Sequence, residues 1–188
     1  MSGGEIDPLA LQAAEAFDHL AGECCCHDRL ADAAAYYHQS LAVRERVFGP
    51  DHHEVADSLV RLAGVGENGP WSHEAEALWR RAIGIYERYL HEQSTARGEL
   101  FGHVFMGLIG TLGNVACAAR SRGDIGAAEE GYRRVGAVIA GAYGPSCAWL
   151  PPADPFAAAL IEQGKRGSAE VSAPQDKAEP GAAPDPAI

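Results

Sequence analysis

Small and apolar residues recur along the chain with the spacing of one helical face, and the same pattern returns three times. Residues four positions apart lie on the same side of an α-helix. The second occurrence follows the first by 42 residues and the third follows the second by 53. In each, an alanine precedes an aromatic residue by four positions: Ala33 and Tyr37, Ala75 and Trp79, Ala128 and Tyr132.

A second pattern precedes each of these segments. Twelve positions before each alanine, another alanine follows a large aliphatic residue: Leu20-Ala21, Leu62-Ala63 and Val115-Ala116. Two helices can cross closely where the side chain between them is small, so each unit predicts two amphipathic helices joined by a turn. Asn68-Gly69-Pro70 and Gly123-Asp124 mark two of the turns. We therefore expect an all-α fold with three helical hairpins at about 9–49, 53–91 and 96–143. A plain helix bundle would leave the shared spacing unexplained.

The string from Ser40 to Leu59 resembles the tetratricopeptide repeat, in the 42-residue form of kinesin light chains. It is similar to that family's helix end, linker and next helix start, with His53 in place of the usual proline. Thr111 to Ala116, followed by Gly123-Asp124, is a second similar string. The resemblance covers residues 9–146. It implies a right-handed α-solenoid of tetratricopeptide-type hairpins that acts as an adaptor or scaffold for another protein.

The third unit departs from this regular spacing. Its 11 extra residues, about 16 Å of helix, predict a lengthened first helix from near Ser94-Thr95 to about Arg122. Each glycine inside a helix costs about 1 kcal/mol relative to alanine. We expect this helix to fray or bend, because it carries four of them: Gly102, Gly107, Gly110 and Gly113.

The two ends of the chain follow a different pattern. Asp154 as N-cap, Pro155 in the first turn and Gly164 as stop predict a short helix over 154–163. Its apolar residues Phe156, Leu160 and Ile161 could cap the open end of the array. Residues 165–188, rich in proline, alanine and charge, and residues 1–8 are expected to be disordered.

Charge and composition narrow the classes of function. The formal net charge of -11 argues against nucleic acids and anionic membranes as partners. No apolar run of about 20 residues is evident, and the N-terminus lacks a secretory signal pattern. The five cysteines are odd in number, which favours a reducing, cytoplasmic setting. Phosphate-binding and nucleophile motifs are missing, so we expect neither an enzyme nor a bound cofactor.

The resemblance also implies a binding site. In tetratricopeptide arrays the first helices of the hairpins line a concave groove, and the polar residue before each aliphatic–alanine pair faces it. These residues are His19, Arg61 and Asn114, with Arg120 one to two turns beyond Asn114. Asparagine can bond a ligand's backbone, and arginine can pair with a carboxylate. The alternative is that all four are ordinary solvated polar residues.

Two other functions remain open at this point. Apolar end faces of a short array could be buried in a homodimer. Cys24, Cys25, Cys26 and His27 could form a metal or redox module. Zinc sites usually take ligands from two separated pairs, however, and adjacent cysteines on a helix point about 100° apart. We therefore predict no metal site.

Overall fold

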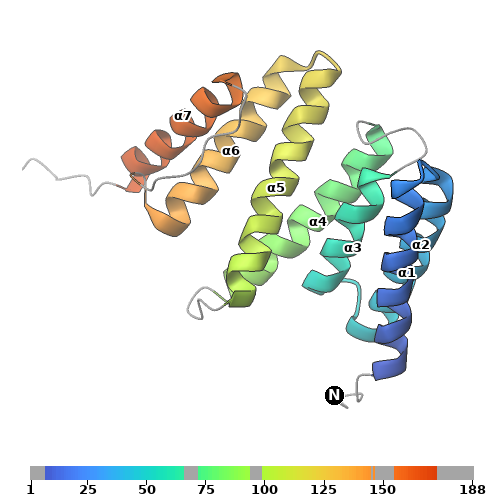
Figure 1. The fold of residues 1–188 in the computed structure, drawn as a ribbon. Helices are drawn as coiled ribbons and strands as arrows, with labels where there is room; N and C mark the ends of the chain where they lie inside the picture. Colours follow the sequence, from blue (N-terminus) through green and yellow to red (C-terminus); the bar gives the residue numbers. More distant parts are fainter. Residues whose placement is uncertain (1–6, 66–71, 94–98, 145, 147–154, 173–188) are drawn as a thin grey trace, which may run out of the picture.

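The computed structural model describes residues 7–65, 72–93, 99–144, 146 and 155–172, and its regular structure in these ranges consists of seven α-helices. They are α1 (Pro8–Cys26), α2 (Leu30–Phe48), α3 (His53–Gly64), α4 (His73–Glu92), α5 (Glu99–Ser121), α6 (Ile125–Tyr143) and α7 (Pro155–Ser172). Each helix packs on the next in chain order, and α3 also touches α5. Figure 1 shows the resulting row of hairpins, with α7 at its end. The predicted all-α array of hairpins is confirmed.

The alanines of the repeat lie where the helices cross. All six are fully or almost fully buried: Ala21, Ala33, Ala63, Ala75, Ala116 and Ala128. The aromatic residues four positions on are buried in the second and third hairpins, at Trp79 and Tyr132, whereas Tyr37 is only half-buried. Small residues at the crossings therefore bring the helices together, and the larger aliphatic and aromatic side chains pack around them.

Polar side chains fix the starts of the helices. Asp7, His52, Ser72 and Asp124 each accept a hydrogen bond from a backbone N–H in the first turn of α1, α3, α4 and α6. Such caps satisfy donors that a helix start leaves free. Asp7 and Pro8 are thus part of the ordered structure, which corrects the expected disorder of residues 1–8; residues 1–6 lie outside the described part. The expected turn at Gly123-Asp124 is present, and Gly123 has φ 81°.

Helix α5 accommodates the insertion in the third unit. It has 23 residues, whereas α3 has 12. It runs as one helix from Glu99 to Ser121. The predicted start at Ser94-Thr95 lies outside the described residues. Gly107 has a packing role, because a Cβ there would lie 3.0 Å from the ring of Tyr86 on α4. A Cβ at Gly102, Gly110 or Gly113 would meet nothing within 4 Å.

Helix α5 is also long and apolar enough, by length and composition alone, to cross a membrane, over Leu100–Ser121. The expectation that the chain holds no such stretch is therefore wrong, because alanines and glycines between the large apolar residues extend the apolar window. In the structure α5 packs between α4 and α6, so its apolar character serves the core of the array.

Helix α7 differs from the short cap predicted over 154–163. It continues to Ser172, which corrects the expected disorder for residues 165–172; residues 173–188 lie outside the described part. Two glycines let its backbone touch that of α6. A Cβ on Gly136 would lie 1.9 Å from the carbonyl oxygen of Ile161, and one on Gly164 would lie 1.9 Å from that of Arg133. The buried Lys165 donates to Glu162 at 2.6 Å.

Ion pairs connect the second helices of successive hairpins. Glu45 on α2 pairs with Arg81 on α4 at 2.7 Å, and Glu87 on α4 pairs with Arg134 on α6. The two glutamates hold the same position in their units, and so do the two arginines, according to the 42- and 53-residue offsets. The backbones of α2, α4 and α6 are not in direct contact with one another in the described chain. Side chains alone therefore join these three helices.

Candidate functional site

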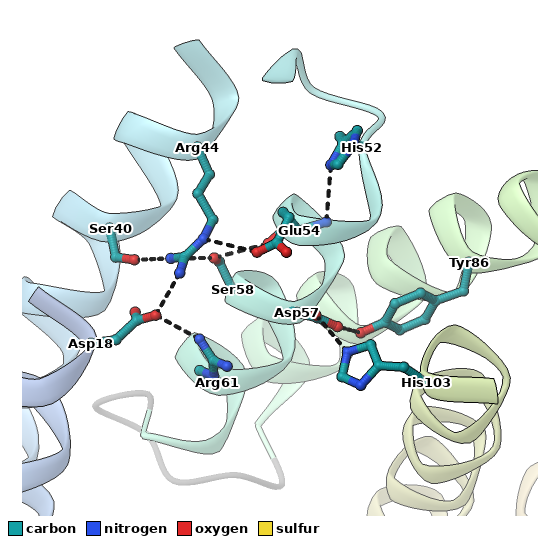
Figure 2. Close-up of polar contacts among 10 residues, drawn as sticks. All are labelled: Asp18, Ser40, Arg44, His52, Glu54, Asp57, Ser58, Arg61, Tyr86 and His103. Carbon is teal, nitrogen blue, oxygen red and sulfur yellow. Dashed lines mark hydrogen bonds and ion pairs between the residues drawn. The ribbon is translucent and has the colours of Figure 1, made fainter. Parts of the chain in front are cut away.

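The exposed sides of α1, α3 and α5 form one surface, which we call the α1–α3–α5 face. On α3 it carries Glu54, Asp57, Arg61 and Gly64, spaced as one side of a helix. On α5 it carries His103, Gly107, Gly110 and Asn114, which are likewise spaced as one side. Two aspartates, one on α1 and one on α3, link these helices to their neighbours (Figure 2).

Asp18 is the first of these links. Its Oδ2 accepts from Arg44 Nη2 on α2 at 2.8 Å and from Arg61 Nη1 on α3 at 2.6 Å. The buried Arg44 guanidinium also donates to Ser40 and Ser58 and lies 3.4 Å from Glu54. Two carboxylates therefore compensate one buried cation. The other oxygen of Asp18, Oδ1, is buried without a hydrogen-bond partner.

Asp57 repeats this arrangement one hairpin further along. Its Oδ1 accepts from the hydroxyl of Tyr86 on α4 at 2.5 Å, and its Oδ2 lies 2.9 Å from Nε2 of His103 on α5. Burial, together with the negative charge of Asp57, raises the pKa of Tyr86 well above its usual range. Tyr86 therefore stays protonated and acts as a donor. In both links an aspartate accepts from the second helix of its own hairpin and from the first helix of the next.

The links leave donors free on the α1–α3–α5 face. Arg61 uses one guanidinium nitrogen for Asp18, and its side chain is 46% exposed. His103 is 62% exposed and uses only Nε2. The side chain of the half-buried Asn114 makes no hydrogen bond within the described residues. Arg61, His103 and Asn114 can therefore still donate to a molecule that lies on this face.

The four residues expected from the sequence lie in different surroundings. Arg61 and Asn114 are both on the α1–α3–α5 face, on neighbouring first helices. His19 is exposed on α1, beside Asp18 in the sequence. Arg120 is exposed near the end of α5, where it interacts with Tyr132 of α6. Burial and a hydrogen bond with Cys117 raise the pKa of Tyr132 to about 12, and the charge of Arg120 opposes this shift.

Three residues of the face escaped the sequence analysis: Asp18 and Asp57 as links, and His103 as a donor. The repeat register contains one signal that could have indicated the aspartate links. Arg44 and Tyr86 hold the same position in their units, 42 residues apart. A charged residue at a position that should be buried predicts a buried acidic partner. The position of His103 depends on the 11-residue insertion in α5, for which the repeat has no equivalent.

The cysteine cluster is divided between the core and the surface. Cys24 is buried and accepts from Arg29 Nη2 at 3.2 Å, Cys25 is half-buried and Cys26 is exposed. Burial and the two neighbouring thiols raise the pKa of Cys25. No three histidine, cysteine or acidic residues of the described ranges are placed to hold a metal ion.

Residues 13–54 match the family described as tetratricopeptide repeat. The matched segment runs from α1 through α2 into the first turn of α3, so it contains the first hairpin, its linker and Asp18. This segment is a tetratricopeptide repeat of the kinesin light chain type. No curated protein matches the chain significantly.

The matched tetratricopeptide repeat is the first of the three hairpins of the array. The matched hairpin is followed by α3–α4 and α5–α6, which share its buried alanines, and α3–α4 also shares its aspartate link. Tetratricopeptide domains commonly mediate protein–protein interaction, and protein partners are therefore implied in general. The match is to a repeat module and not to a catalytic domain.

Proposed function

We propose that the protein is an adaptor or scaffold that binds a peptide or helix of a partner protein on the α1–α3–α5 face, as in a concave tetratricopeptide groove. The observation that carries this proposal is the set of free donors at Arg61, His103 and Asn114. Asp18 and Asp57 hold the first two in place, so a partner does not have to order them when it binds. Arg61 and His103 are exposed, and Asn114 is half-buried.

The chemistry of these donors defines the partner segment. Arg61 can give its remaining N–H groups to a carboxylate or to main-chain carbonyl groups. Asn114 can both donate to and accept from a peptide backbone. Gly110 lies on the same face of α5 and has no side chain to keep the backbone of the partner away. A segment with one acidic side chain and an accessible main chain fits this surface.

The test is to capture partners with the wild type and then measure their direct binding to variants. We expect Arg61→Ala combined with Asn114→Ala to weaken binding of a captured partner at least tenfold. Arg61 is partly exposed and Asn114 is unbonded, so the variant should stay folded, as a thermal melt would show. Arg81→Ala with Glu45→Ala, on the second helices, is the matched control. Equal binding of both variants and the wild type would refute the proposal.

Self-association is the alternative partner for this surface. Light scattering over a range of concentrations distinguishes the two cases. A dimer that Arg61→Ala with Asn114→Ala dissociates would make a second copy the partner. A monomer at all concentrations favours a different protein.

We also propose a cytoplasmic location. The four described cysteines, Cys24, Cys25, Cys26 and Cys117, are unpaired, which supports a reducing compartment. Fractionation of cells that express the tagged protein tests this, and recovery in an oxidising compartment would contradict it.

A further inference from the structure

The first hairpin has a side that faces away from the rest of the array, at the end opposite α7 (Figure 1). Among the described helices, the backbone of α1 contacts that of α2 alone. Leu20 lies about 200° around α1 from Asp18, which reaches α3. Tyr36 lies about 180° around α2 from Glu45, which pairs with Arg81 of α4. We call the side that carries Leu20 and Tyr36 the α1–α2 end face.

The middle of the α1–α2 end face is apolar. Its α1 half is a stripe of exposed residues three or four positions apart: Leu9, Ala13, Ala16 and Leu20. Its α2 half consists of half-buried residues: Tyr36, Val43 and Val47. The rings of Phe17 and Tyr36 stack where the two halves meet, with centroids 6.4 Å apart. A contiguous apolar surface of this kind is typical of a protein interface with an aromatic pair near its centre.

The other end of the array has a different surface. Helix α7 buries Leu160 and Ile161 beside α6, and three of its four exposed side chains within the described part are polar: Ala159, Glu162, Gln163 and Arg166. A terminal element of a repeat array needs a polar outer side to stay soluble. Helix α7 meets this requirement, whereas the first hairpin does not. Stacking of one copy's first hairpin on another copy's α7 would therefore join an apolar surface to a polar one. Contact between two α1–α2 end faces joins like with like.

Charged residues at the two ends of α2 complement each other across a two-fold axis. Asp32 and Arg46 each lie seven residues from the exposed Gln39, on nearly the same side of α2. When two α2 helices cross antiparallel at Gln39, Asp32 of each copy faces Arg46 of the other. Arg46 makes no ion pair in the described chain. Asp32 pairs with Arg29 at 2.8 Å, but both side chains are 58% exposed, so the carboxylate can accept from a second guanidinium.

The remaining charges near the α1–α2 end face do not oppose this arrangement. Glu23, exposed on α1, adds a carboxylate at the end of the hairpin that carries Asp32. Asp7 lies at the end that carries Arg46, but its side chain caps α1 by accepting from the Leu9 N–H at 3.0 Å. The positive start of the helix offsets the charge of Asp7. Arg46 of one copy therefore meets an end of the other copy where carboxylates outnumber guanidinium groups.

The area of the α1–α2 end face is sufficient for a dimer. Helices α1 and α2 have 19 residues each, which gives a length of about 28 Å. Two packed helices are about 20 Å wide, so two copies would bury about 1,100 Å² in total. Specific interfaces begin at about 1,000 Å². A single helix of another protein would cover only one of the two apolar halves.

We propose that the α1–α2 end face joins two copies of this chain in a two-fold dimer, with the two α2 helices antiparallel. Leu9, Leu20 and the Phe17–Tyr36 pair form its apolar centre, and Asp32 pairs with Arg46 of the second copy at both edges. The dimer closes, because the α1–α2 end face of each copy is used once. This proposal does not depend on the function of the α1–α3–α5 face, which stays accessible in both copies.

The first test measures the mass of the protein by light scattering. Interfaces of this size are typically weak, so concentrations from about 1 to about 300 µM are needed to follow the transition from monomer to dimer. Ala16→Arg places a charge in the apolar centre, and we expect it to weaken dimerisation at least about tenfold. Ala42→Arg, at an exposed alanine of the same hairpin outside the end face, is the matched control and should change it less than about twofold. Thermal melts check that both variants are folded.

The second test exchanges the charges at the edges. In Asp32→Arg two arginines face each other at both edges, and in Arg46→Asp two aspartates do. We expect each variant alone to dimerise at least about tenfold more weakly than the wild type. A mixture of the two variants restores both pairs and should form a heterodimer about as tight as the wild-type dimer. A loss of stability in either variant would not produce this recovery.

Three outcomes would overturn the proposal. A wild type that stays monomeric at all concentrations excludes the dimer, without bearing on binding of a partner at Arg61 and Asn114. Equal dimerisation of Ala16→Arg and the wild type excludes this face; if Arg61→Ala with Asn114→Ala dissociates that dimer, the contact lies on the α1–α3–α5 face. A mixture of the charge variants that dimerises no better than each alone excludes the antiparallel arrangement of α2.

Discussion

Arg44 and Tyr86 hold the same position in successive hairpins, and each donates a hydrogen bond to an aspartate on the first helix of its own hairpin. The equivalent residue of the third hairpin, 53 positions further on, is the fully buried Ile139. The position thus changes from a cation to a hydroxyl to an aliphatic side chain along the array. Of the three hairpins, only the first two have a polar link at this position.

Removal of Asp18 should destabilise the first junction strongly. In Asp18→Ala the buried Arg44 keeps only Glu54, at 3.4 Å, as a carboxylate partner. The loss of one partner exposes the full desolvation cost of a buried cation. We therefore expect the free energy of unfolding, measured in urea, to fall by about 2–3 kcal/mol. Asp32→Ala removes an ion pair whose two side chains are each 58% exposed. A loss of less than about 0.5 kcal/mol is expected for this control. Equal losses in the two variants would contradict the polar link.

Two glycines of α5 should respond oppositely to the same substitution. Gly110→Ala places a methyl group in open space, so the gain in helix propensity should raise the free energy of unfolding by about 0.5–1 kcal/mol. Gly107→Ala places it 3.0 Å from the Tyr86 ring, whose hydroxyl is held by Asp57. We expect that variant to be about 1 kcal/mol less stable than the wild type. Thermal or urea unfolding of both proteins gives the comparison. Stabilisation of both would show that Tyr86 can move aside.

The contact between α6 and α7 depends on its two glycines. Gly136→Ala would force a methyl group to within 1.9 Å of the Ile161 carbonyl oxygen, so the helices must separate. We expect α7 to lose its docked position while the first hairpin stays intact. Hydrogen exchange should show the loss of protection in α7 and in the part of α6 beneath it, and α1–α2 should keep theirs. Gly126→Ala, with its nearest atom at 3.9 Å, is the control. Unchanged protection of α7 in Gly136→Ala would refute the close crossing.

His52 should make the stability of the array sensitive to mild acid. Burial, together with the positive charge of His53, lowers the pKa of His52, whose Nδ1 accepts from the Glu54 N–H at the start of α3. The unfolded chain therefore binds this proton more readily than the folded one. Stability present at pH 8 should be lost as the pH falls below about 6.5, the usual histidine pKa.

His52→Asn keeps an acceptor at the N-cap but cannot titrate, so it should reduce this loss. Urea unfolding at pH 8 and pH 5.5 measures the difference, with the exposed His19→Asn as control. An equal pH dependence in His52→Asn and the wild type would assign the effect to other groups.

Local spacing was enough to predict the hairpins and their crossings. Alanines twelve positions apart and aromatic residues four further on are determined by contacts between neighbouring helices, which the repeat carries in the sequence. The same register also placed Arg61 and Asn114 on first helices. Their role in binding stays a prediction.

The features that escaped the sequence analysis depend on contacts between units. His103 reaches Asp57 only because the insertion in α5 extends that helix beside α3. The length of α7 depends on Gly136 and Gly164, which lie 28 positions apart and match each other only in three dimensions. The sequence predicts a helix stop at Gly164, whereas this glycine lies inside α7 and contacts α6. Glycine has no side chain, so both roles have the same appearance in a sequence.

The ion pairs between α2, α4 and α6 should make the array sensitive to salt. Glu45, Arg81, Glu87 and Arg134 have side chains 34–48% exposed, so dissolved salt weakens the attraction between them. At Asp18 and Asp57 the carboxylates are only 16% and 17% exposed, although their partners on the next hairpin, Arg61 and His103, are 46% and 62% exposed. Because salt screens buried carboxylates less than exposed ones, we expect added salt to loosen the contacts between the second helices more than those between the first helices. The spacing of the second helices should then depend on the ionic strength of the solvent.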